Sequence, residues 1–130
     1  MPIELKYLVA SALLFMLMIG VQALMGIVYQ GIVPLIGSRD SLKDDTVLIS
    51  RAKRANQNMI EAMVLFTPLV LVAAQTNNLN ATTALGAALF FWDRAAFAPL
   101  YWMGVAWLRT IVWFVSVVGI LMILSQILPF

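Results

Sequence analysis

Long runs of apolar residues alternate with short polar connections along this chain of 130 residues. A helix needs about 20 mostly apolar residues, within a range of about 17 to 25, to cross the hydrocarbon layer of a membrane. Four segments meet this requirement, and they cover residues 5–36, 46–75, 81–98 and 105–128. The pattern therefore predicts an all-α fold, an integral membrane four-helix bundle, as a single transmembrane domain over residues 1–130.

The connections between these segments are polar and short. Residues 37–45, GSRDSLKDD, join the first two segments, and residues 76–80, TNNLN, join the second and third. Asn80 or Thr82 is a suitable N-cap for the third helix. We expect that helix to end near Pro99, because proline lacks the backbone N–H that continues a helix. The first segment has no small-residue cleavage site after it, so we expect it to stay as a membrane span.

Composition supports a membrane protein and excludes several kinds of chemistry. Hydrophobic residues make up 63% of the chain and charged residues 11%, whereas soluble domains are about half apolar and a quarter charged. The lipid bilayer is thus the expected partner. The net charge of +2 comes from scattered basic residues, which form no stripe that could follow nucleic acid. Cysteine and histidine are absent, so we expect no disulfide and no metal site.

The basic residues also predict the orientation of the spans. Cytoplasmic loops retain lysine and arginine. Apart from Lys6, all of them lie in or beside the connections that join segments one to two and three to four, namely Arg39, Lys43, Arg51, Lys53, Arg54, Arg94 and Arg109. We therefore expect a multi-pass protein, as in a bacterial inner membrane, with both termini on the non-cytoplasmic side.

The second segment carries the most informative polar pattern. At 100° per residue, Arg51, Arg54, Asn58 and Glu61 lie within about 80° of one another on one helix face, and Lys53 lies on another. Ionisable groups at membrane depth cost roughly 2.5–3.5 kcal/mol each and usually face a bundle interior or a wet cavity. An alternative interpretation makes the arginines interfacial anchors, with the other two side chains joining helices by hydrogen bonds.

Two further arginines are expected on the same side of the membrane. Arg94 lies near the end of the third segment, where Asp93 could simply neutralise it, and Arg109 lies near the start of the fourth. Bundling predicts a cationic cluster that faces the cytoplasm and comprises Arg51, Arg54, Arg94 and Arg109. Such a cluster suits an anionic ligand held by charge-assisted hydrogen bonds. Tyr101 follows Arg94 by two helical turns if the helix continues past Pro99.

These motifs resemble the MAPEG family, the membrane-associated proteins of eicosanoid and glutathione metabolism, and the bacterial-type members in particular. The resemblance rests on the pattern R-A-x-R-A-x-x-N-x-x-E over residues 51–61. It is supported by Arg94, by Tyr101 seven residues later, and by the run LRTIVW over residues 108–113.

The resemblance implies a homotrimer of four-helix protomers with glutathione as cofactor, bound between neighbouring subunits. In family enzymes the residues matching Arg54, Asn58, Glu61 and Tyr101 contact glutathione. The arginine that matches Arg109 is proposed to stabilise the glutathione thiolate, which would make Arg109 the catalytic residue. The expected function is a membrane-bound transferase or peroxidase that uses glutathione, or a related thiol, on hydrophobic electrophiles.

Several departures from the family pattern argue against eicosanoid synthase chemistry. Ala62 and Phe97 stand where some members have tyrosine, and Gln30 stands near a helix-one position where some have arginine. The proline that usually follows the motif glutamate by about one turn comes only at Pro68. A non-catalytic lipid-binding or scaffold protein of the same fold is therefore a second hypothesis. A small drug–proton exporter is a third, although arginines near Glu61 would hold that carboxylate ionised.

Overall fold

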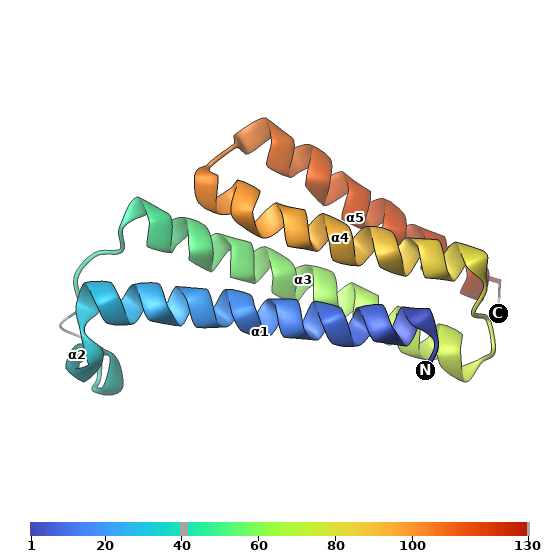
Figure 1. Cartoon of the computed structure of the whole chain (residues 1–130), viewed down its shortest axis with the longest axis horizontal. Coiled ribbons are helices and arrows are strands. Elements are labelled where there is room, and N and C mark those ends of the chain that lie inside the picture. The colour runs from blue at the N-terminus through green and yellow to red at the C-terminus, as the bar shows by residue number, and fades with distance from the viewer. Residues whose placement is uncertain (40–41, 130) are drawn as a thin grey trace.

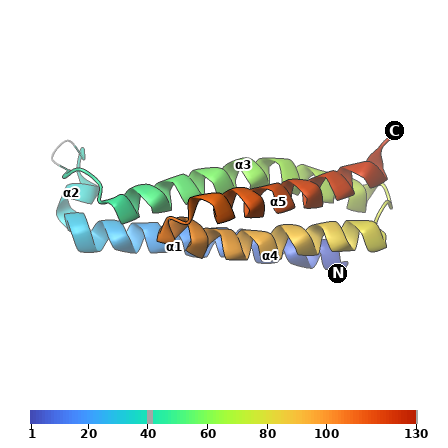
Figure 2. The same cartoon turned by 90° about the horizontal axis from the view of Figure 1, so that it is seen from above.

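The computed structural model describes residues 1–39 and 42–129, and within them the chain forms five helices (Figure 1). Four long helices lie alongside one another in both views, and a short helix lies at one end of the bundle (Figures 1 and 2). In chain order they are α1 (Ile3–Gln30), α2 (Ile32–Ile36), α3 (Val47–Gln75), α4 (Ala81–Met103) and α5 (Ala106–Ile127). The prediction of an all-α fold is confirmed. Asp40 and Ser41, inside the predicted polar connection, and Phe130 lie outside the described residues.

The long helices support an integral membrane protein. Within the described residues α1, α3 and α5 are apolar and long enough to cross a membrane. Large apolar side chains cover the outside of the bundle, among them Leu17 and Val28 of α1, which are 69% and 79% exposed. Such a surface is costly in water and favourable in lipid. The fourth long helix, α4, is not among these candidates, so its role as a fourth span stays a prediction.

The first apolar segment is divided, although the hydrophobic pattern predicted one continuous span over residues 5–36. Gly31 separates α1 from α2 with a φ of 87°, a backbone conformation that favours glycine. Pro34 lies three residues later and cannot donate a hydrogen bond to the Gln30 carbonyl, and its ring crowds that same group. The chain therefore turns after Gln30, and α2 projects from the end of the bundle (Figure 1).

Side-chain caps begin α3 and α4. The Thr46 hydroxyl accepts a hydrogen bond from the Ile49 amide at 3.1 Å. At the start of α4 the Asn80 side chain accepts from the Thr83 amide at 3.1 Å, and the Thr83 hydroxyl accepts from the Asn80 amide at 2.8 Å. This reciprocal arrangement is a capping box. Asn80, one of the two predicted caps, is thus the N-cap of α4.

The helix predicted over residues 81–98 is α4 in the structure. It continues five residues further, to Met103, with Pro99 inside it. Proline removes a single donor here, and the helix ends only at Gly104, whose φ is 76°. The Gly104 amide donates to the Tyr101 carbonyl and the Val105 amide donates to the Leu100 carbonyl, at 3.1 and 3.2 Å. These two bonds form a Schellman ending. Tyr101 therefore lies on α4, two turns after Arg94.

Two glycines allow α4 and α5 to come into close contact. A Cβ added at Gly119 would lie 2.6 Å from the Gly86 carbonyl oxygen, and one added at Gly86 would lie 2.7 Å from the Gly119 carbonyl oxygen. Only glycine permits such an approach of two helix backbones. The two helices separate from this crossing toward the turn that joins them (Figure 1). That separation leaves space for side chains near the turn.

Candidate functional site

A small pocket lies where α3, α4 and α5 meet near the α4–α5 turn. Its volume is about 250 Å³. We call it the three-helix pocket, and it is lined by Asn58 of α3, Phe97 and Tyr101 of α4, and Arg109, Thr110 and Trp113 of α5. The structure thus brings together Asn58, Tyr101 and Arg109, three of the predicted site residues, from three different helices.

A row of stacked side chains runs back from this pocket, with two aromatic rings between two arginines. The Arg109 guanidinium carbon lies 4.7 Å from the centre of the Tyr101 ring. The Tyr101 and Phe97 ring centres are 5.2 Å apart, and the Arg94 guanidinium carbon lies 4.2 Å from the Phe97 ring. Each contact between a cation and a ring face is worth about 0.5–2 kcal/mol. The stack holds Arg109 at the pocket, because its guanidinium rests on the Tyr101 ring.

Arg94 lies behind the pocket, enclosed by the bundle. The residue is 1% exposed, so it does not take the cytoplasm-facing position that we expected for it in the cationic cluster. Its Nη1 donates to Asn58 Oδ1 at 2.6 Å, and its Nη2 lies 3.7 Å from Asp93 Oδ2. Since a guanidinium only donates, it fixes the amide oxygen of Asn58 on its own side. The Nδ2 donors of Asn58 are the end of the amide left for a ligand.

Arg51, in the second turn of α3, packs beside the C-terminal end of α4. Its Nη1 donates to the Trp102 carbonyl at 3.3 Å, close to the C-terminal end of the helix, where a cation is favourable. A Cβ at Gly104 would lie 2.6 Å from the Arg51 guanidinium carbon. The absence of a side chain at Gly104 therefore gives Arg51 its place beside the α4–α5 turn.

Arg54 and Glu61 lie on the exposed side of α3. They flank Asn58 by about one helical turn on either side, which places all three on one helix face. The Glu61 carboxylate accepts a hydrogen bond from the Gln57 side chain at 3.4 Å. Neither Arg54 nor Glu61 lines the three-helix pocket. A single chain therefore leaves these two predicted site residues on an open surface beside the pocket.

Asn56 lies on a different face of α3, toward α1. Its Nδ2 donates to the Gln22 side chain at 2.6 Å and to the Met18 carbonyl at 3.4 Å. Because these bonds join α1 to α3 by their polar groups, they fix the register between the two helices. They also turn the Asn58 face away from α1 and toward α4.

Three lining residues of the pocket, Phe97, Thr110 and Trp113, were not singled out as site residues from the sequence. Thr110 follows Arg109 directly, and Trp113 lies four residues after it, one turn along the same face of α5. Helical spacing from Arg109 could have found Trp113. The Thr110 hydroxyl donates to the Ala106 carbonyl at 3.2 Å, a bond within the helix.

No curated protein and no solved structure matches this chain. The family model of the MAPEG family matches residues 7–128, which include every helix residue that forms the three-helix pocket. Nearly the whole chain is covered, and the resemblance inferred from the motifs is confirmed. The chain belongs to the MAPEG family, a family of membrane proteins of glutathione and eicosanoid metabolism.

Proposed function

We propose that this protein is a membrane-bound transferase or peroxidase that uses glutathione, or a related anionic thiol, to attack hydrophobic electrophiles dissolved in the membrane. The observation that carries the proposal is the convergence of Asn58, Tyr101 and Arg109 on one pocket from three helices. Family membership supports the choice of thiol.

The groups at and beside the pocket suit the chemistry of glutathione, a peptide thiol with two carboxylates and one ammonium group. Arg109 and Arg54 are cations for carboxylates or a thiolate. Asn58 Nδ2 and the Tyr101 hydroxyl are neutral donors. Glu61 is an acceptor for the ammonium group. This donor and acceptor set complements a zwitterionic peptide better than it complements a purely apolar ligand.

The catalytic role belongs to Arg109 in this proposal. A cation beside a thiol lowers the pKa of the thiol, so that the thiolate, which is the nucleophile, is present at neutral pH. Arg109 is held on the Tyr101 ring at 4.7 Å, which limits the reorganisation needed to stabilise a negative sulfur. The bound thiol supplies a nucleophile to a chain that has no cysteine. The membrane supplies the second, hydrophobic substrate.

We also propose that a neighbouring copy of the chain completes the site, in a homotrimer. Arg54 and Glu61 are exposed on α3, and charged groups are costly when they face hydrocarbon. Packing α3 of one protomer against another would cover this face and enclose the ligand. Native mass spectrometry of the protein released from mild detergent tests the assembly, and a protein that stays monomeric contradicts it.

The thiol proposal is tested by titrating the detergent-purified protein with glutathione and following the ultraviolet absorbance of the thiolate. We expect a thiolate signal from the wild type and none from Arg109→Ala, with weaker binding in Asn58→Ala. Lys6→Ala is the matched control, since it removes one cation at the opposite end of the bundle. No binding at millimolar glutathione would overturn the proposal.

A non-catalytic lipid-binding protein is the second candidate, and one contact favours it. Phe97, which replaces a tyrosine of some family members, has no hydroxyl and serves as the surface on which Arg94 packs, at 4.2 Å. This substitution removes a polar group from the pocket. Binding of glutathione without a thiolate signal, together with no turnover of an electrophile, would favour this candidate.

A further inference from the structure

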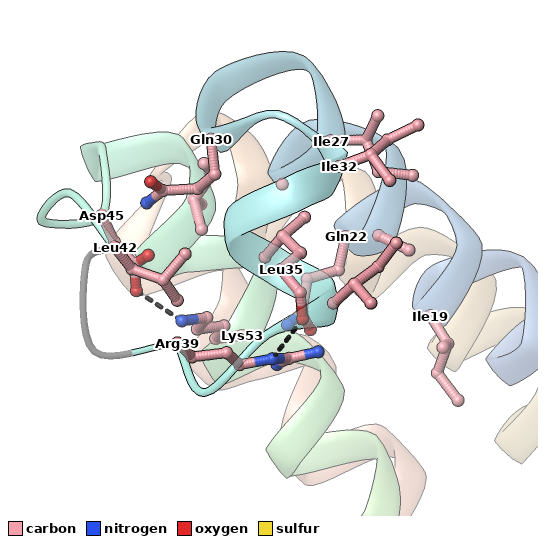
Figure 3. Close-up of a pocket in the computed structure, with 14 residues that line it drawn as sticks. Ile19, Gln22, Ile27, Gln30, Ile32, Leu35, Arg39, Leu42, Asp45 and Lys53 are labelled. Carbon is pink, nitrogen blue, oxygen red and sulfur yellow. Dashed lines mark hydrogen bonds and ion pairs between the residues drawn. The ribbon is translucent and has the colours of Figure 1, made fainter.

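A second pocket lies on the other side of α3, between the C-terminal half of α1, α2 and the start of α3 (Figure 3). Its volume is about 690 Å³, within the range of about 300–1,000 Å³ that small-molecule sites occupy. Most of its wall is apolar, and each helix supplies apolar side chains, among them Ile27 of α1, Leu35 of α2 and Ile49 of α3. We call it the α1–α2 pocket. It shares no lining residue with the three-helix pocket.

The charged groups that line the α1–α2 pocket come from the chain after α2 and from the first two turns of α3. Arg39 and Lys53 lie on the same side of the pocket in Figure 3, with Asp45 beside Lys53. The Lys53 ammonium is 2.6 Å from the Asp45 carboxylate, and the two side chains are 51% and 31% exposed. Arg39 Nε donates to the Leu35 carbonyl at 2.9 Å, which directs the guanidinium back toward α2. Two cations and one carboxylate therefore leave a net positive rim on an apolar pocket.

Hydrogen bonds hold the pocket open on the side of the polar connection. The Gln30 side chain, which also lines the pocket, accepts from the Lys43 amide at 2.8 Å and donates to the Lys43 carbonyl at 2.7 Å. The Lys43 ammonium donates to the Tyr29 carbonyl at 3.3 Å. These bonds tie the connection to the end of α1. The walls of the pocket and the bonds that join them therefore come from one chain.

We propose that the α1–α2 pocket binds one anionic phospholipid, with the phosphate at Arg39 and Lys53 and an acyl chain along the apolar wall. The pocket lies at one end of the bundle, where α1 stops and the polar connection begins, the level at which lipid head groups meet a spanning helix. Its positive rim complements a phosphate, and a basic pocket between helices is a recurring way to bind acidic head groups. The apolar wall distinguishes a lipid from free phosphate.

Asp45 provides an internal check on this proposal. Its carboxylate pairs with the Lys53 ammonium, which the lipid phosphate would also contact. A lipid phosphate must therefore compete with Asp45 for Lys53, and Asp45→Asn should raise the affinity for anionic lipid. A purely structural role for the Lys53–Asp45 pair predicts no such gain.

The test uses the full chain in detergent without glutathione, so its outcome is independent of the proposed thiol chemistry. Native mass spectrometry compares retention of phosphatidylglycerol with retention of phosphatidylcholine carrying the same acyl chains, and with inorganic phosphate. We expect one phosphatidylglycerol per chain, held in preference to both alternatives. Arg39→Gln and Lys53→Gln should each weaken this binding about fivefold. Arg109→Ala should leave it unchanged.

Two further variants separate the head group from the acyl chain. Lys6→Gln removes an equal charge at the opposite end of the bundle, at a side chain that does not line the pocket, and should leave phosphatidylglycerol binding unchanged. Ala23→Phe keeps every charge but places a bulky ring in the apolar part of the pocket, and should abolish phosphatidylglycerol binding. Ala23 is exposed, so the larger side chain is accommodated. Ala23→Leu is a smaller replacement for the same test.

Five results would overturn the proposal. Equal retention of phosphatidylcholine would show that the cations do not select the ligand. An equal loss in Lys6→Gln would indicate attraction to net charge alone. Full binding in Ala23→Phe, or equal binding of inorganic phosphate, would remove the acyl chain from the site. Loss of phosphatidylglycerol on self-association would assign the pocket to a second copy of the chain.

Discussion

The buried pair of Asp93 and Arg94 allows a direct test of how the three-helix pocket is supported. The two side chains are 4% and 0% exposed, with Nη2 of Arg94 3.7 Å from Oδ2 of Asp93. Replacing Arg94 by methionine keeps most of the side-chain volume and removes the cation. It leaves the Asp93 carboxylate enclosed without a counter-ion and deprives Asn58 Oδ1 of its donor at 2.6 Å.

The size of the effect follows from these two losses. Removing one partner of a buried ion pair costs about 3–5 kcal/mol, and a buried acceptor left without a donor costs about 1–3 kcal/mol. The losses overlap because one guanidinium supplies both interactions. We therefore expect Arg94→Met to lower the free energy of unfolding by about 3–5 kcal/mol.

A double variant separates the charge from the hydrogen bond. Asp93→Asn combined with Arg94→Met removes both charges, and replacing a buried pair by neutral groups of similar volume is often close to neutral. The double variant should recover most of the stability and keep a deficit of about 1–3 kcal/mol from Asn58. Unfolding in detergent micelles, followed by circular dichroism against denaturant, measures these differences. Lys6→Met is the control for loss of an exposed cation.

Equal stability of the single and double variants would refute this reasoning. It would show that the Asp93 carboxylate does not depend on Arg94 for its place in the bundle. A wild-type-like Arg94→Met would go further, because it would mean that neither the ion pair nor the bond to Asn58 contributes to the fold.

Two other predictions concern the scaffold. Gly119→Ala should lower the free energy of unfolding by about 1–3 kcal/mol, because the new Cβ would lie 2.6 Å from the Gly86 carbonyl oxygen. The control is Gly20→Ala, where a Cβ would meet nothing within 4 Å, and it should be neutral or stabilising by up to about 1 kcal/mol. A similar loss of stability in both variants would contradict the close crossing of α4 and α5. Gln30→Ala removes two hydrogen bonds to the Lys43 backbone and should speed hydrogen exchange and proteolysis of the connection after α2 while exchange in α3 stays unchanged.

The local sequence was sufficient to predict much of α3 and the start of α4. α3 runs from Val47 to Gln75, within the segment of residues 46–75 that the apolar pattern predicted. The polar residues at its start recur with helical spacing and the rest of the segment is apolar, so both parts indicate a helix. Asn80 caps α4 through bonds to residues two and three positions away. Such interactions depend on neighbours in the chain, so they can be read from spacing.

The ends of α1 and α4 were harder to predict because glycine and proline act differently in each. Pro34 follows Gly31, and together they end α1, whereas Pro99 lies inside α4 and the helix stops at Gly104. The hydrophobic pattern is nearly continuous through both regions. Which residue ends a helix depended on where the chain could turn back and pack, which a linear pattern does not record.

The sequence by itself determined the apolar helices, the family pattern of residues 51–61 and the common face of Arg51, Arg54, Asn58 and Glu61, since helical spacing requires nothing beyond the chain's own geometry. Only the tertiary structure decided which of these groups share a pocket. Arg94 was expected among exposed cations and is instead buried behind Asn58, whereas Arg109 rests on Tyr101. Packing sets these positions, because contacts between helices depend on crossing and register, and a local pattern carries neither.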